Sequence, residues 1–127
     1  MKELLSLLLV LFIAMPAAAY DFEVGGIYYD KNNDGKSLTV TYKDTETKYS
    51  GSVSIPSEVT VEGTKYSVTA IGTYAFKECA DPTMVSLPNS LTVIDQYAFQ
   101  SCSGLSLIDI PNSLTSINDY AFTYSFY

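Results

Sequence analysis

The sequence contains no histidine, no tryptophan and no arginine, and it has only two cysteines among its 127 residues. Without histidine, the chain lacks the side chain that most often serves as a metal ligand or as a general base near neutral pH. It also shows no serine-nucleophile elbow, phosphate-binding loop, metal-ligand cluster or recurrent carboxylate pair. These absences predict no catalytic residue, no cofactor and no metal site, so we expect the protein not to be an enzyme.

Positive charge is also scarce. Fourteen acidic residues outnumber seven lysines, and the formal net charge is −7. Nucleic acids and anionic membrane surfaces attract basic proteins, so this balance predicts neither as a partner. An acidic surface of this kind is typical of a soluble extracellular protein.

The only long apolar run lies at the N-terminus. Lys2 precedes the run, and Pro16 and Ala17–Ala19 follow it. A positive start, a short apolar core and small residues before the cleavage point are typical of a secretory signal peptide. We expect residues 1–19 to be removed after Ala19, which leaves no membrane span and a secreted or cell-surface protein. The alternatives are an uncleaved anchor and a buried core helix.

Two nearly identical segments dominate the second half of the chain. They are LPNSLTVIDQYAF at 87–99 and IPNSLTSINDYAF at 110–122, and IGTYAF at 71–76 repeats their ending. The endings recur every 23 residues. A fixed period in the 20–29 range is typical of leucine-rich-repeat solenoids, whose units stack into one continuous core.

One unit can be interpreted in physical terms. The segment LSLIDIP is short, apolar and closed by Pro111, which suits a strand because proline cannot donate a ladder hydrogen bond. Alternation predicts Ile108 and Ile110 on the inner face, and Leu107 and Asp109 on the outer face. The segment NDYAF predicts a cap residue and about one helical turn, with alanine allowing close approach and phenylalanine filling the centre.

The N-terminal half predicts hairpins. Alternating residues on both sides of Glu62–Gly63 predict one β-hairpin, and residues 22–42 predict another. The predicted fold is therefore mostly β, a short leucine-rich-repeat solenoid of 23-residue repeats preceded by N-terminal β-hairpins. The expected organisation is a signal peptide at 1–19, a β-hairpin cap at 20–48 and the solenoid at 49–127.

The segment DKNNDG within the second hairpin matches the start of a calcium-binding loop through Asp30, Asn32 and Asp34. The match then fails, because Thr41 stands where a calcium loop needs a bidentate glutamate. Asn and Asp before glycine also suit a tight turn. We therefore predict a hairpin turn at this segment.

The repeats carry a family resemblance. The pattern "C…L..I.IPNSL..I..YAF" runs over Cys79–Phe99 and Cys102–Phe122, and Tyr49–Phe76 forms a weaker lead-in. This pattern resembles the BspA-type leucine-rich repeats of bacterial cell-surface proteins, known from Bacteroidetes. The resemblance implies a right-handed solenoid whose sheet face binds other proteins or surfaces. The implied partner is a host extracellular protein or another surface protein. Pro82, in place of the leucine at 105, and Ser125, in place of a third cysteine, depart from the pattern.

Two stripes are candidate partner-binding surfaces. Tyrosine combines apolar area with a polar tip and is favoured at interfaces, but stacked rings can also simply cover one another. Exposed apolar residues side by side on the sheet suit a contact surface. The tyrosine stripe comprises Tyr74, Tyr97 and Tyr120, and the outward sheet positions are Ser52, Ser54, Met84, Ser86, Leu107 and Asp109.

Cys79 and Cys102 occupy the same repeat position. Neighbouring coils stack ~4.8 Å apart, which is compatible with disulfide Cα separations of ~4.4–6.8 Å. Ser125, at the next equivalent position, shows that a small unpaired side chain suffices. We favour two buried free thiols over a disulfide, and no histidine is present to activate either one.

Two functions follow. The first is a secreted or cell-surface module that mediates protein binding or adhesion. The alternative is a structural fragment or spacer of a longer repeat array, which self-associates through an open C-terminal coil. The deciding feature is whether Tyr124, Phe126 and Tyr127 cover that last coil.

Overall fold

The computed structural model describes residues 20–81 and 83–125. The predicted signal peptide with its cleavage after Ala19, the departure at Pro82, and Phe126 and Tyr127 lie outside the described residues. Among the residues described, no helix has the length and apolarity that crossing a membrane requires.

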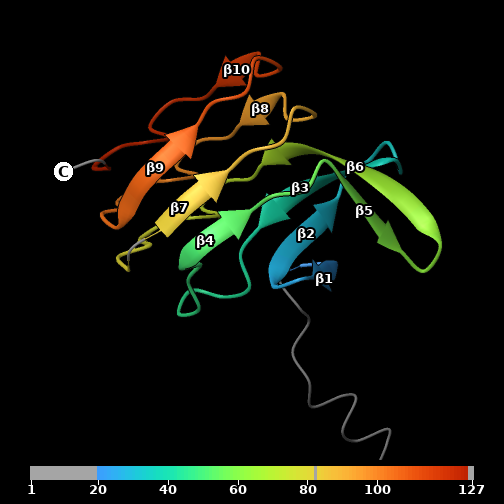
Figure 1. The fold of residues 1–127 in the computed structure, drawn as a ribbon, viewed down its shortest axis with the longest axis horizontal. Coiled ribbons are helices and arrows are strands. Elements are labelled where there is room, and N and C mark those ends of the chain that lie inside the picture. The colour runs from blue at the N-terminus through green and yellow to red at the C-terminus, as the bar shows by residue number, and fades with distance from the viewer. Residues whose placement is uncertain (1–19, 82, 126–127) are drawn as a thin grey trace, which may run out of the picture.

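Two sheets build the molecule (Figure 1). The larger, sheet A, has the strand order β1-β2-β3-β6-β8-β10, with β5 paired to β6; the smaller, sheet B, has the order β4-β7-β9. The strands of sheet A are β1 (Phe22–Val24), β2 (Ile27–Lys31), β3 (Ser37–Thr41), β5 (Glu58–Val61), β6 (Thr64–Ile71), β8 (Val93–Ile94) and β10 (Ser116–Ile117). Those of sheet B are β4 (Gly51–Ser54), β7 (Thr83–Ser86) and β9 (Leu105–Asp109).

The 23-residue repeats form successive coils of a solenoid. Each coil contributes one strand to each sheet, and the strands of neighbouring coils pair in parallel, as β6 with β8 and β7 with β9. Backbone bonds also join the turns between strands: Phe76 N donates to Ala98 O and Phe99 N to Ala121 O, each at 2.7 Å. The solenoid prediction is therefore confirmed.

The helical turn predicted at the end of each unit is not formed. Residues 118–124 make hydrogen-bonded turns, in which Ala121 N donates to Asn118 O and Thr123 N to Tyr120 O. Tyr120 has φ +61° in the middle of this segment. A left-handed residue interrupts a right-handed helix, so the chain reverses direction there instead of coiling further.

Phenylalanines occupy the centre of the solenoid, as predicted. The ring centroids of Phe76 and Phe99 are 4.8 Å apart, and those of Phe99 and Phe122 are 5.0 Å apart, with nearly parallel planes. Ala98 and Ala121, one residue before these rings, are buried and let the coils approach. Aromatic pairs at such distances stabilise a fold beyond the area that they bury.

Burial decreases toward the last coil. Ile71 and Ile94 are fully buried, whereas Ile117 at the equivalent position is 50% exposed. The same holds just beyond the strands of sheet B, where Ile55 is 3% exposed, Leu87 is partly buried and Ile110 is 46% exposed. The alternation predicts Ile110 on the inner face, and its exposure follows from its place in the last described coil, because each coil is covered by the next one and no described coil follows β9 and β10.

The N-terminal hairpin, β2–β3, closes through the segment that resembles a calcium loop. Asp34 accepts hydrogen bonds from Lys36 N, Ser37 N and Ser37 Oγ at 2.8–2.9 Å. These bonds, the first of them most strongly, lower the pKa of Asp34. The carboxylate is thus used to hold the turn, as predicted for a tight hairpin.

The cap and the repeats share one sheet, since β3 pairs in parallel with β6.

The predicted hairpin around Glu62–Gly63 is present as β5–β6, with φ +50° and +83° at the two turn residues. Adjacent positive φ values are typical of a type I′ turn. The division between a cap at 20–48 and a solenoid at 49–127 stays a prediction, while sheet A runs across it.

Tyr49 joins the cap to the solenoid. Its ring lies 4.6 Å from the ring of Phe76 and so extends the phenylalanine stack by one member. Its hydroxyl accepts a hydrogen bond from Tyr28 N at 3.0 Å and donates one to Thr41 O at 2.6 Å. Burial raises the pKa of Tyr49 above its usual range, so the hydroxyl keeps the proton that it donates.

We expect Tyr49→Phe to lower the free energy of unfolding by about 1–3 kcal/mol, because it leaves Tyr28 N and Thr41 O without their partner while the ring stack remains. Urea denaturation followed by circular dichroism measures this change. Tyr28→Phe is the control, since the Tyr28 hydroxyl makes no hydrogen bond in the described structure. Equal stability of the two variants would contradict the role given to the Tyr49 hydroxyl.

Candidate functional site

The outer face of sheet B brings together the sheet positions that the sequence predicted. The parallel register places Ser52 opposite Met84, and Met84 opposite Leu107. A second row runs beside the first and joins Ser54, Ser86 and Asp109. The predicted rows therefore form, each with one residue from each of three strands.

The first row is apolar and accessible. Met84 is 46% exposed and Leu107 is 54% exposed, although both lie within strands. They line a shallow hollow of about 200 Å³. The inward residue between the two rows, Val85, is buried, so the exposed apolar area is not a consequence of poor packing beneath the sheet.

One irregularity separates β9 from its neighbours. The pairing of β7 with β9 shifts register between Thr83 and Met84, which leaves Ser106 as an extra residue in β9. The Ser106 hydroxyl donates to Thr83 O at 3.2 Å. A bulge of this kind changes the direction in which the following side chains point. Here it keeps Leu107 level with Met84.

The three stripe tyrosines form a stack of their own. The ring centroids of Tyr74 and Tyr97 are 5.5 Å apart, and those of Tyr97 and Tyr120 are 5.4 Å apart. The Lys77 ammonium lies 4.7 Å from the Tyr74 centroid and covers that end. Tyr120 is 61% exposed at the other end. Because the inner ring faces contact one another, the edges and the Tyr120 face are what a partner would meet.

The tyrosine stack keeps strained backbone in place. Tyr74, Tyr97 and Tyr120 have φ values of +64°, +59° and +61°. This region costs about 1–2 kcal/mol for a residue other than glycine. Strain of this kind persists only where surrounding contacts outweigh it, and the inter-ring stacks are among the contacts that these tyrosines make.

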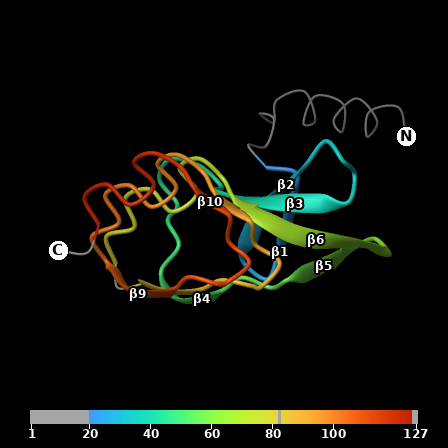
Figure 2. The ribbon, with the colours of Figure 1, turned by 90° about the horizontal axis from the view of Figure 1, so that it is seen from above.

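The two candidate stripes lie apart. The turns that follow β8 and β10 and carry the tyrosines are on the side of the solenoid opposite sheet B (Figure 2). A single flat partner surface therefore contacts one stripe or the other. The outer face of sheet B exposes Met84 and Leu107, and the tyrosine stripe exposes Tyr74 and Tyr120.

Cys79 and Cys102 are buried free thiols that stack on each other. Contact with the Cys79 thiol, together with burial, raises the pKa of Cys102 above its usual range. A buried thiol that stays protonated is a poor nucleophile. Whether the pair is ever oxidised stays a prediction, and in this structure it fills space, as Ser125 does one coil later.

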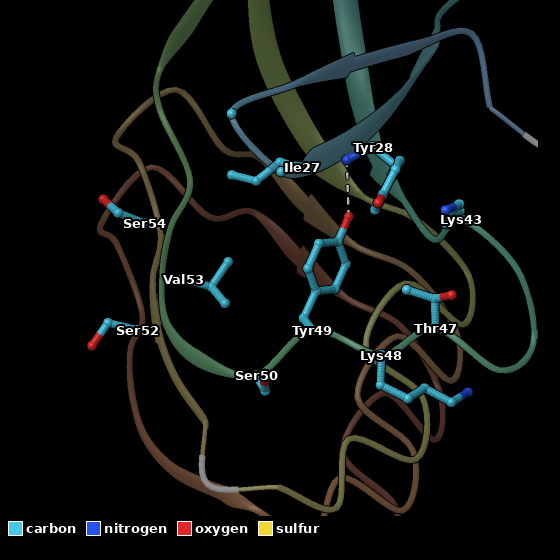
Figure 3. Close-up of a pocket in the computed structure, with 12 residues that line it drawn as sticks. Ile27, Tyr28, Lys43, Thr47, Lys48, Tyr49, Ser50, Ser52, Val53 and Ser54 are labelled. Carbon is cyan, nitrogen blue, oxygen red and sulfur yellow. Dashed lines mark hydrogen bonds between the residues drawn. The ribbon is translucent and has the colours of Figure 1, made fainter.

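A third feature had no signal in the sequence. A pocket of about 450 Å³ opens between β4 and the Gly25–Gly26 turn that joins β1 to β2 (Figure 3). Its lining residues are Gly25, Gly26, Ile27, Tyr28, Lys43, Thr47, Lys48, Tyr49, Ser50, Ser52, Val53 and Ser54. They come from segments far apart in the chain, and sequence spacing therefore does not reveal that they meet.

The fold is that of a leucine-rich-repeat solenoid, and the comparisons specify its type. The family model described as "BspA type Leucine rich repeat region (6 copies)" matches residues 49–126. The chain therefore belongs to the BspA-type leucine-rich-repeat family, as the repeat pattern predicted. No curated protein gives a match.

Several solved structures are similar. A leucine-rich repeat protein from Bacteroides ovatus is 32% identical, with a TM-score of 0.66 over 75% of this chain and 24% of its own. One from Bacteroides capillosus is 28% identical, with a TM-score of 0.64 over 82% of this chain and 91% of its own. A leucine-rich cell surface protein from Faecalibacterium prausnitzii, at 24% identity and a TM-score of 0.65 over 88% of this chain and 29% of its own, shares the fold.

Family membership points to a role in protein interaction, since leucine-rich repeats are generally binding modules rather than enzymes. The chain spans about a quarter of the Bacteroides ovatus protein, 24% of its length. What such longer proteins bind therefore enters only as a proposal for this chain.

We expect Tyr97→Ala to lower the free energy of unfolding by about 1–3 kcal/mol, because two ring contacts are lost while the strained φ is kept. Tyr97→Gly should be at least as stable as Tyr97→Ala, since glycine adopts φ +59° without strain. Urea denaturation of the two variants and the parent protein measures the order. A glycine variant more stable than the parent would show that the stack does not offset the strain.

Proposed function

We propose that the protein is a secreted or cell-surface module that binds an extracellular protein partner through the outer face of sheet B. The partner is a host extracellular protein or another surface protein. The predicted signal peptide supports secretion, and the similarity to a leucine-rich cell surface protein supports a surface location.

One observation carries this proposal: Met84 and Leu107 are about half exposed on strands β7 and β9, above the buried Val85. Apolar residues placed side by side on a rigid surface are typical of protein contact sites. The neighbouring row of Ser54, Ser86 and Asp109 supplies hydroxyl and carboxylate groups beside them. An apolar centre with a polar rim matches the usual anatomy of a protein interface.

The sheet also favours binding energetically. Backbone hydrogen bonds hold β4, β7 and β9 in fixed register, so the side chains on their outer face are already arranged before a partner arrives. A preorganised surface loses less conformational entropy on binding.

Removing the apolar row tests the proposal. The double variant Met84→Ser/Leu107→Ser keeps the strands, because serine already occupies the equivalent position 52. A panel of purified extracellular-matrix and bacterial surface proteins is screened by surface plasmon resonance. We expect at least one partner to bind the parent protein, with affinity reduced roughly tenfold or more in the double variant.

The matched control is Ile110→Ser/Ile117→Ser, which removes two apolar residues of similar exposure at the open coil. Binding through sheet B should be unchanged in this variant. Equal loss in both double variants, or binding unaffected by Met84→Ser/Leu107→Ser, would contradict the assignment to the sheet face.

A second candidate function is structural, as a spacer that associates through the open last coil. The observation that favours it is the exposure of Ile110 and Ile117, at 46% and 50%, where Ile55, Ile71 and Ile94 at equivalent positions are buried and Leu87 is partly buried. The outer edges of β9 and β10 lie at the ends of their sheets in the described residues. Apolar area combined with two open strand edges suits pairing with another coil.

Sedimentation velocity over a range of protein concentrations tests the structural role. Self-association should increase with concentration in the parent protein and disappear in Ile110→Ser/Ile117→Ser. The variant Met84→Ser/Leu107→Ser should associate like the parent. A protein that stays monomeric at all concentrations would exclude association through the last coil.

A further inference from the structure

The two sheets end differently at the cap. Sheet A continues past β6 into the cap strands β3, β2 and β1, whereas sheet B ends at β4 (Figure 1). A solenoid coil ordinarily contributes a strand to each sheet, so sheet B lacks a strand beneath the cap. The pocket beside β4 occupies that position.

The outer edge of β4 presents unpaired backbone groups. Ile55 N donates to Ser86 O at 2.9 Å, so Ile55 directs its backbone toward the neighbouring coil. Backbone groups alternate between the two edges of a strand. Ser52 and Ser54 therefore direct their N–H and C=O groups away from β7, toward the pocket. Such an edge is a template for pairing with another strand.

The space beside this edge has the size and shape for an extended chain. Figure 3 shows Val53 and the Tyr49 ring between β4 and the turn at Ile27. The side chains of Val53 and Ile27 are buried, at 8% and 7% exposure, and form an apolar floor for this pocket. A second hollow of about 300 Å³ shares Gly25, Ile27 and Ser54 with the pocket and continues past Pro56. Together they follow the edge of β4 along its length.

One end of the groove is basic although the protein is acidic. Lys43 and Lys48 line the pocket, and its lining includes no aspartate or glutamate. Within the described part of the chain, the two ion pairs use Lys65 and Lys77, so neither pocket lysine forms an ion pair, although the Lys43 charge acts on the nearby Asp44 carboxylate. The nearby Asp44 carboxylate accepts hydrogen bonds from Thr47 and Glu46 N, and these bonds lower its pKa.

We propose that this groove binds an extended peptide segment of a protein partner, which pairs with the outer edge of β4 as an added strand. The segment places a carboxylate, from an acidic side chain or a C-terminus, beside Lys43 and Lys48. Backbone pairing supplies the main contacts in strand addition, and side-chain pockets supply the specificity. The binding element is the edge of β4, so it does not depend on the Met84–Leu107 row.

The experiment uses an array of random ten-residue peptides, each made with a free and an amidated C-terminus, and the purified protein as probe. We expect the bound peptides to be enriched in aspartate and glutamate, or to require a free C-terminus. The comparison of the two C-termini separates the two sources of the carboxylate. Fluorescence anisotropy then gives the dissociation constant of the strongest peptide.

Ser54→Pro tests the strand pairing, with Ser54→Ala as its matched control. Proline removes the N–H that faces the groove, and proline is tolerated on an edge strand. Both variants lose the hydroxyl, and proline in addition removes the backbone donor and fixes φ. We expect Ser54→Pro to bind the peptide roughly tenfold more weakly than Ser54→Ala.

Lys43→Gln/Lys48→Gln tests the charge and leaves β4 unchanged. We expect roughly fivefold weaker binding of acidic peptides and no change for a neutral amidated version. Slower hydrogen exchange at the Ser52 and Ser54 amides on adding peptide to the parent protein reports pairing directly, even if Ser54→Pro does not fold. The variant Met84→Ser/Leu107→Ser should bind the peptide normally, which separates this site from the sheet face.

The proposal is overturned if no peptide is captured, or if the Ser52 and Ser54 amides exchange equally fast with and without a bound peptide. Acidic peptides that bind Lys43→Gln/Lys48→Gln as tightly as the parent would overturn the carboxylate assignment. A parallel array of sulfated and sialylated glycans is included. Binding to those glycans in place of peptides would show that the lysines recognise a carbohydrate anion instead.

Discussion

The structure depends on one stack of aromatic rings that runs through the centre of every coil. Phe76, Phe99 and Phe122 repeat every 23 residues, and Tyr49 adds the first ring from the cap side. A single coil cannot bury its own phenylalanine, so each coil is stable only against a neighbour. The Tyr49 hydroxyl then fixes the cap to the same stack through Tyr28 N and Thr41 O. Cap and repeats therefore stabilise each other.

The need for a neighbour explains both ends of the molecule. At the cap side, sheet A is extended by three strands while sheet B ends at β4, and a groove with a free strand edge results. At the far side, the last described coil exposes Ile110 and Ile117, whose equivalents in earlier coils are buried or partly buried. In the middle of the solenoid, β7 and β8 each pair with a strand on both sides. What remains for binding is the outer face of sheet B and these two margins.

The repeat pattern predicted most of the fold because it is local and periodic. The strand before Pro111, the buried alanine–phenylalanine pairs and the hairpin at Glu62–Gly63 each follow from alternation, proline or turn chemistry within a few residues. The same alternation predicted that Met84 and Leu107 lie side by side and exposed. The predicted helical turn failed because the repeated tyrosines adopt positive φ values, which the local sequence does not signal.

Residue order and tertiary packing thus determined different properties of this protein. The sequence by itself determined the repeat length, the family and the acidic, histidine-free composition, since these depend only on residue order and residue type. Only the tertiary structure decided which equivalent positions are covered and where β4 meets the cap, because burial depends on what packs against a residue. Lys43, Tyr49 and Ser54 belong to different elements, and they line one pocket only once the coils are stacked.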